Sequence, residues 1–196
     1  NVPLKDNGEI QDDTRIRESL STIKFVKDHG GKIIILSHLG RPDGKIKEDL
    51  RLTKIAAHLS SILKDKIKKF DEIISEEVKK YIGGMHDGEV IMLENIRFDA
   101  GEENCDEKFT KELASLGDIF VSDGFSVVHR RHASTAGLAD FLPAYGGFLM
   151  EKELKAMSPI LEQESIRPLT MIFGGAKIDT KIGIINLLGR VFMQCL

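Results

Sequence analysis

Short apolar runs alternate along the chain with longer segments in which apolar residues recur at helical spacing. The short runs are rich in β-branched residues, which is typical of strands buried in a parallel sheet. The longer segments have the period of helices that cover such a sheet. This alternation predicts an α/β fold, a Rossmann-like parallel sheet flanked by helices. The expected strands are residues 32–37, 89–93, 118–122 and 169–173.

The helical segments have recognisable start and stop signals. Asp12, Asp13 or Thr14 can cap the first helix, and the pairs Gly30-Gly31 and Gly83-Gly84 each follow a helical stretch. Such capping residues and terminal glycines are the usual boundaries of helices. The expected helices are residues 14–29, 51–63, 76–82, 107–116 and 148–163.

The last of these helices divides the chain. It is followed by the polar stretch 165–168 and then by a new strand-like run, so we expect a connecting helix at residues 147–166. Residues 1–146 then form one domain, and residues 167–196 the beginning of a second α/β domain. Because the chain opens on Asn1 without a methionine and stops soon after a strand, turn and helix begin, we expect a fragment at both ends.

Composition narrows the class of protein. Hydrophobic residues make up 41% and charged residues 30% of the chain, which excludes the disordered and fibrous classes. The longest unbroken apolar runs fall far short of the ~20 residues of a membrane helix, and no signal-peptide pattern opens the chain, so we expect a cytoplasmic protein that binds no membrane. Cys105 and Cys195 lack metal-like spacing and are expected to be free thiols, with no metal site. The formal net charge of −3 argues against a nucleic-acid partner.

Arginines follow three of the predicted strands. Arg41 comes shortly after the first strand together with His38, Arg97 follows the second, and Arg130 follows the third together with His132. Parallel α/β sheets bind ligands at the carboxyl ends of their strands. The planar guanidinium fork suits phosphate and carboxylate groups, so the three strand ends predict a site for a small, multiply charged anion.

A glycine turn, GGAK at residues 174–177, follows the predicted strand at 169–173. Backbone N–H groups of such a turn, together with a helix N-terminus, favour phosphate. Lys177 and Lys181 are four residues apart and can present two cations on one helical face. Glycine pairs also simply end strands, and the motif matches neither the Walker A nor the dinucleotide fingerprint. A dinucleotide-dependent enzyme is disfavoured for the same reason.

Several of these residues have a plainer interpretation. Any one arginine taken alone is more simply a solvated surface residue. His38 and His132 can be structural hydrogen-bonding groups, because no nucleophile lies nearby for them to activate. Only the repetition at three strand ends favours the anion site. For the acidic clusters we expect helix capping and solvation. These clusters are Asp12, Asp13, Glu102, Glu103 and residues 151–153.

Read in order, eight short motifs resemble the landmarks of the phosphoglycerate kinase family, and the resemblance covers nearly the whole chain. SHLGRP, LENIRF and the FLMEKEL part of the seventh motif are specific enough that their order and spacing are hard to obtain by chance. The eight are NVPL (1–4), DDTRI (12–16), SHLGRP (37–42), LENIRF (93–98), GEE (101–103), HRRHAST (129–135), GFLMEKEL (147–154) and GGAK (174–177).

The resemblance implies roles for individual residues. The substrate, 3-phosphoglycerate or 1,3-bisphosphoglycerate, would be bound by Asn1, Arg15, His38, Leu39, Gly40, Arg41, Arg97 and Arg130. Lys177 and Lys181, with the backbone of Gly175 and Ala176, would bind ADP or ATP, which is used with Mg²⁺ held mostly by the missing domain. Arg15 and Lys177 would be the catalytic pair that stabilises the transferring phosphoryl group.

The implied activity is reversible phosphoryl transfer between 1,3-bisphosphoglycerate and ADP, giving 3-phosphoglycerate and ATP in glycolysis, by a monomer. We expect this chain alone to be inactive as a kinase. The alternative is a truncated, non-catalytic anion-binding module. The loop before His129 departs from the family pattern, with Val127 and Val128 in place of small or hydroxylated residues. Arg131, after His129, stands where a small residue is common. We expect these changes to retune the pocket without erasing it.

Overall fold

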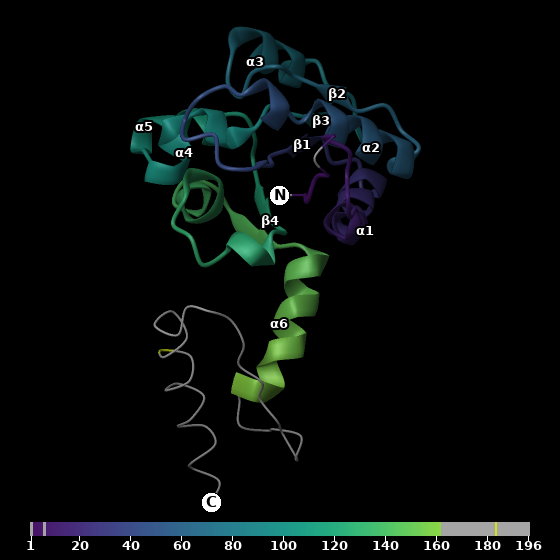
Figure 1. The fold of residues 1–196 in the computed structure, drawn as a ribbon, viewed down its shortest axis with the longest axis vertical. Helices are drawn as coiled ribbons and strands as arrows, with labels where there is room; N and C mark the ends of the chain where they lie inside the picture. Colours follow the sequence, from purple (N-terminus) through teal and green to yellow (C-terminus); the bar gives the residue numbers. More distant parts are fainter. Residues whose placement is uncertain (1, 6, 162–182, 184–196) are drawn as a thin grey trace, which may run out of the picture. The chain divides into compact units, whose positions relative to one another are not determined.

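The computed structural model describes residues 2–5, 7–161 and 183. The chain divides into two compact units, Asn1–Glu151 and Lys152–Leu196. The predicted domain limits at residues 146 and 166 stay a prediction. Almost all of the described residues belong to the first unit, which carries strands β1 to β5 (Figure 1).

Three parallel strands form the central sheet of the first unit, in the order β1 (Ile33–Ile35), β3 (Val90–Met92), β2 (Lys68–Lys69). A second pair, β4 (Phe120–Ser122) and β5 (Ala144–Gly146), is also parallel. The α/β fold with a parallel sheet is therefore confirmed. β1, β3 and β4 lie inside predicted strands, β2 and β5 were not predicted, and the strand predicted at 169–173 lies outside the described residues.

Helices cover both faces of the central sheet, because successive apolar side chains of its strands point to opposite faces. Ile33 and Val90 face a core cluster that includes residues of α1 and α2, whereas Ile34 and Ile91 face the opposite cluster, which includes residues of α3 and α5. Each fully buried side chain of this size contributes about 1.5–3 kcal/mol. The helices are α1 (Thr14–Asp28), α2 (Thr53–Leu63), α3 (Glu76–Gly83), α4 (Ala100–Asn104), α5 (Glu107–Ala114) and α6 (Phe148–Leu161).

The helix predictions for α1, α2, α3 and α5 are confirmed to within two residues at each end, and α6 begins where predicted; α4 was not predicted. Among the cap candidates of α1, Asp12 accepts from Thr14 N at 2.8 Å. Asp13 occupies the cap position without a side-chain cap bond and binds Arg17 and His58 instead. Solvation alone therefore does not describe Asp13.

The start of α6 is attached to the end of β4. Asp123 Oδ1 accepts from the backbone N–H groups of Leu149 at 2.9 Å and Met150 at 3.2 Å. Thr22 Oγ1, from α1, accepts from Phe148 N at 2.9 Å. These two side chains occupy N–H groups of the first helical turn that have no partner within the helix, so α6 is fixed where it begins.

Candidate anion-binding site

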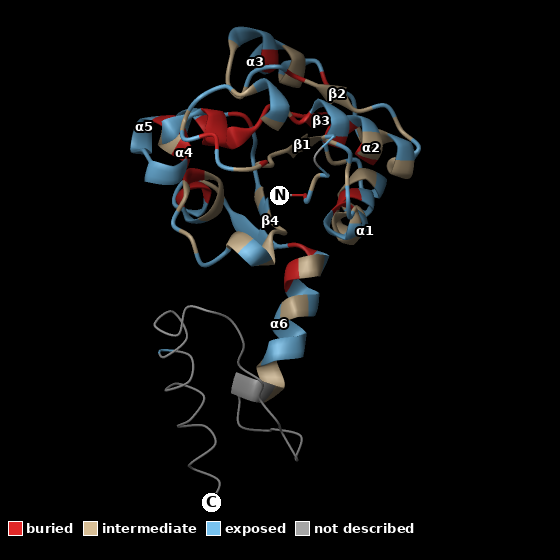
Figure 2. Cartoon of the chain, viewed as in Figure 1, coloured by how far each residue is buried: buried red, intermediate tan, exposed pale blue. Residues whose placement is uncertain are grey.

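The chain leaves β3 through the interior of the first unit. Every residue from 90 to 98 is buried, and this stretch is red in Figure 2. Three of these residues are polar: Glu94, Asn95 and Arg97. A short 3₁₀ turn, η2 (Ile96–Phe98), follows the strand, and Asn95 caps it by accepting from Arg97 N at 3.2 Å. The turn thus places an arginine inside the protein at the carboxyl end of a central strand.

Arg97 is only partly paired. Its side chain is 3% exposed, Nη1 donates to Gly40 O at 3.0 Å, and Nε lies 3.3 Å from Glu103 Oε1. Nη2 is buried without a hydrogen-bond partner. A buried polar group with no partner is costly and uncommon, and such groups often mark the position of a ligand or ion. The guanidinium therefore keeps binding capacity for an anion.

Other cations surround this guanidinium. Burial lowers the pKa of Arg97, and the nearby charges of Arg130 and Arg41 lower it further, while Glu103 acts in the opposite direction. Burial also lowers the pKa of His38, to about 3, and the charges of Arg97 and Arg130 again contribute. His38 is consequently neutral near pH 7. The structure thus brings His38, Arg41, Arg97 and Arg130 into one electrostatic neighbourhood, where like charges repel in the absence of an anion.

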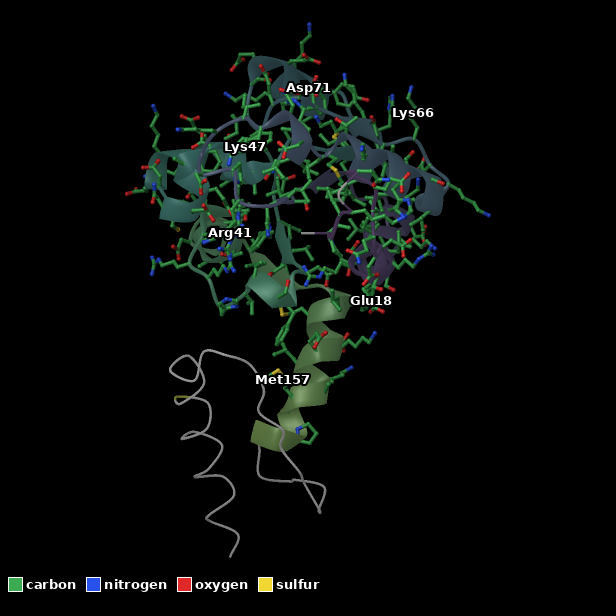
Figure 3. All side chains as sticks on the ribbon, in the orientation of Figure 1. Glu18, Arg41, Lys47, Lys66, Asp71 and Met157 are labelled. Carbon is green, nitrogen blue, oxygen red and sulfur yellow. The ribbon has the colours of Figure 1, made fainter. Side chains whose placement is uncertain are left out.

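The β1 end of the site is a tight turn. Gly40 has a φ of +63°, so the backbone conformation favours glycine, and a Cβ there would lie 2.8 Å from Leu50 Cδ2 and displace that side chain. Leu39 is buried, with its side chain in the core, and its contact with a ligand stays a prediction. Arg41 is exposed, and its carbonyl oxygen accepts from Lys47 Nζ at 3.3 Å; both residues are labelled in Figure 3.

The β4 end of the site is shaped by Thr135 and Glu102. The Thr135 hydroxyl donates to Arg130 O at 2.7 Å and accepts from His132 N at 3.0 Å. Glu102 accepts from Ser134 N at 2.9 Å and Ser134 Oγ at 2.6 Å, and lies 3.6 Å from His132 Nδ1. The expectation that Glu102 is a solvated surface residue is wrong, because it is buried and holds the segment after Arg130.

Of the remaining predicted site residues, the structure describes only Arg15. Arg15 lies exposed in the first turn of α1, and its charge acts on Asp12. The other predicted contacts lie outside the described residues, so their placement stays a prediction: Asn1, Gly175, Ala176, Lys177 and Lys181. Within the part of the chain that the structure describes, no group of three His, Cys, Asp or Glu residues is suited to a metal ion.

Sequence reasoning missed the two polar residues just before Arg97. Glu94 is buried and accepts from Lys69 Nζ at 2.5 Å and Leu52 N at 2.9 Å. Burial pushes the pKa of Glu94 upward, but these donors outweigh burial and lower the pKa below its usual value. Asn95 is completely buried. The available signal was a pair of polar residues directly after a fully apolar strand.

The family model described as phosphoglycerate kinase matches residues 1–194. The chain belongs to the phosphoglycerate kinase family. Two solved phosphoglycerate kinases are similar to it. The enzyme from Pyrococcus horikoshii OT3 is 33% identical with a TM-score of 0.81, and the match covers 97% of this chain and 48% of that one. The enzyme from Coxiella burnetii is 36% identical with a TM-score of 0.80, and the match covers 95% of this chain and 46% of that one. The chain spans about half the length of these relatives.

Within the described residues, none of the helices combines the length and apolar character that crossing a membrane requires. The family assignment agrees with the order of motifs found in the sequence. It covers the strand ends that carry Arg41, Arg97 and Arg130 as well as the start of α6.

Proposed function

We propose that the first unit binds 3-phosphoglycerate or 1,3-bisphosphoglycerate and is the substrate-binding half of a phosphoglycerate kinase. One observation carries the proposal: the Arg97 guanidinium is buried, incompletely paired and surrounded by the charges of Arg41 and Arg130. Repulsion among these groups is relieved by an anion with several charged oxygens, which the phosphate and carboxylate of the substrate supply. His38 completes the cluster as a neutral hydrogen-bonding group.

The proposed substrate site also includes residues that the cluster does not. Asn1 and Arg15 would approach the ligand from the amino-terminal segment, and the backbone near Leu39 and Gly40 would line the turn. Arg15 is proposed to act twice, as a substrate contact and, with Lys177, as a catalytic residue at the transferring phosphoryl group. Phosphoryl transfer demands positioning and charge neutralisation more than covalent chemistry, so arginine and lysine suit these roles.

The nucleotide, ADP or ATP, is proposed to bind through the backbone of Gly175 and Ala176 and the side chains of Lys177 and Lys181. Mg²⁺ bound with the nucleotide would neutralise phosphate oxygens. We further propose the domain limits 1–146, 147–166 and 167–196, and a monomer that acts in the glycolysis of the cytoplasm. The full reaction, transfer between 1,3-bisphosphoglycerate and ADP, is proposed for a chain of the length of the solved relatives.

Calorimetric titration with 3-phosphoglycerate tests the proposal. The wild-type chain should release heat and gain thermal stability at millimolar ligand, and Arg97→Met should do neither. Lys66→Met, an exposed residue labelled in Figure 3, is the matched control and should bind normally. Absence of both heat and protection in the wild-type chain would contradict the proposal.

A coupled kinase assay separates the enzyme from a non-catalytic anion-binding module. The chain of 196 residues should show negligible turnover of ATP and 3-phosphoglycerate. A version extended to the full length of the relatives should show turnover that is lost in Arg97→Met. Binding without turnover in the extended version would favour the non-catalytic module.

A further inference from the structure

Asn95 uses its whole side chain to join two strand ends. Its Oδ1 accepts from Leu39 N at 3.3 Å and from Arg97 N at 3.2 Å. Its Nδ2 donates to Leu39 O and to Leu50 O, both at 2.9 Å. A primary amide offers two N–H donors and one oxygen with two lone pairs. The four bonds therefore use the full hydrogen-bonding capacity of the Asn95 side chain, and every partner is a backbone group.

Three of the four bonded backbone groups belong to the two turns that carry the cations, and the fourth, Leu50 O, belongs to the 3₁₀ turn η1 (Glu48–Leu50). Leu39 lies between His38 and Arg41 in the turn after β1, and Arg97 lies in the turn after β3. Asn95 is completely buried, so its side chain makes these bonds away from bulk water. Without the amide, both polar groups of Leu39 would lose their hydrogen-bond partner inside the protein, which is unfavourable for buried polar groups.

The backbone of Asn95 is itself held independently of its side chain. Its N–H donates to Glu94 Oε1 at 2.8 Å. Glu94 is in turn bound by Lys69 at 2.5 Å and by Arg51 Nη1 at 2.9 Å. The amide therefore extends from a fixed point. It joins the Leu39 backbone to the Arg97 backbone, alongside the bonds from Ile96 N to Ser37 O at 3.1 Å and from Arg97 Nη1 to Gly40 O at 3.0 Å.

We propose that Asn95 is a positioning residue of the anion site, which sets the separation between the His38–Arg41 turn and Arg97. The identity of the anion rests on the proposed function, whereas the positioning role rests on these hydrogen bonds. Asn95 does not touch the ligand. It acts through Leu39 and Arg97, and its removal lets the two turns move apart.

The first experiment needs no ligand. The imidazole of His38 is titrated by NMR in the wild-type chain, in Asn95→Ala and in Val78→Ala. Val78 lies in α3, is fully buried in the core and takes no part in the site, so its truncation serves as a control that lowers stability without touching the site. In Asn95→Ala the pKa of His38 should rise toward its ordinary value, while Val78→Ala should leave it unchanged. Equal His38 titrations in wild type and Asn95→Ala would overturn the proposal.

The second experiment measures the affinity for 3-phosphoglycerate at a temperature at which all variants are folded. Asn95→Ala should bind roughly tenfold more weakly or worse, because small displacements of binding groups are costly, and Val78→Ala should bind as the wild type does. Equal losses in the two variants would overturn the proposal. A wild-type chain that binds no 3-phosphoglycerate would refute the proposed function, and the His38 titration would still decide the role of Asn95.

Asn95→Ser serves if Asn95→Ala does not fold. It keeps an uncharged polar group at the position, but the hydroxyl cannot reach all four backbone partners. The same rise in the pKa of His38 and a loss of affinity in the same direction are expected. A folded Asn95→Ser with wild-type values in both measurements would overturn the positioning role.

Discussion

Arg97 Nη1 donates a hydrogen bond to Gly40 O at 3.0 Å, so an arginine after β3 helps to close the turn after β1. Nη1 of the guanidinium thereby takes part in the fold, while Nη2 is buried without a hydrogen-bond partner. The same side chain keeps a buried donor for an anion and is paired on one side with Glu103.

Arg97→Met should abolish detectable ligand binding while leaving the free energy of unfolding within about 1 kcal/mol of wild type, or above it. A buried, incompletely paired charge contributes little to stability, and an apolar side chain of similar volume can replace it without loss. Chemical denaturation measures the change. Arg51→Met is the control and should be clearly less stable, because Arg51 is paired with the buried Glu94. Equal destabilisation of the two variants would contradict this prediction.

Arg41→Ala should weaken 3-phosphoglycerate binding by about 1.5–3 kcal/mol, the scale of a charge-assisted hydrogen bond. Arg131→Ala should cost under about 0.5 kcal/mol, as for an ordinary surface change. The side chain of Arg131 is 80% exposed, and its Nη2 lies 3.9 Å from Asp140 Oδ2, so Arg131 lies on the outer surface. Arg41→Lys should also bind weakly, because an ammonium cannot reproduce the fork. Titrations at one ionic strength that gave equal losses at Arg41 and Arg131 would mean that the site is wrongly assigned.

Acid should destabilise the fold through His38. Its pKa is about 3 in the folded chain, lowered by burial from the ordinary 6.5. Between these two pH values the unfolded chain binds a proton that the folded chain does not, so the free energy of unfolding should fall as the pH decreases through this window. His38→Gln should flatten that part of the stability profile. An unchanged profile in this variant would contradict the assignment.

Ligand binding should be coupled to proton uptake by the same residue. An anion beside His38 favours the imidazolium and raises its pKa, so the complex should carry more protons than the free chain at mildly acidic pH. Calorimetry in buffers of different ionisation enthalpy measures the uptake. The difference between wild type and His38→Gln isolates the contribution of His38 from that of the phosphate group. A zero difference would refute the coupling.

Glu94→Gln should destabilise the fold by about 3 kcal/mol, because it leaves the cations Arg51 and Lys69 without their buried partner. The pKa of Glu94 is lowered in the folded chain, so its contribution is present above the ordinary value and should be lost as the pH falls through the folded value. Denaturation at pH 7 measures the loss. Glu76→Gln, at an exposed ion pair, should cost under about 0.5 kcal/mol.

The sequence allowed the main strands and the basic strand ends to be predicted because both depend on local order. Apolar runs mark β1 and β3. The carboxyl ends of parallel strands meet at one edge of the sheet, so arginines that follow these strands are expected to lie near one another. β2 and β5 escaped prediction because neither forms an apolar run: β2 is Lys68–Lys69, and β5 has the sequence Ala-Tyr-Gly. The pairing of β2 with β3 decides its conformation.

The supporting residues of the site could not be predicted in the same way. Asn95 after a strand has the pattern of any turn-forming residue, and its partners Leu39 and Leu50 are distant in the sequence. Glu102 has the pattern of a solvated helix start, and only the return of the chain at Ser134 buries it. Long-range packing determines both roles, and no local period encodes it.

The pairing of β1 with β3 has a consequence for the order of events during synthesis. Ile33 finds its partner only when Val90 has left the ribosome, because the strand between them in sequence, β2, lies on the far side of β3. Sheets built from such distant segments fold slowly, since loop closure precedes the contacts that reward it. The two arginine-bearing turns are therefore brought together late, and a nascent chain shorter than this length should expose the apolar faces of α1 and β1 to chaperones.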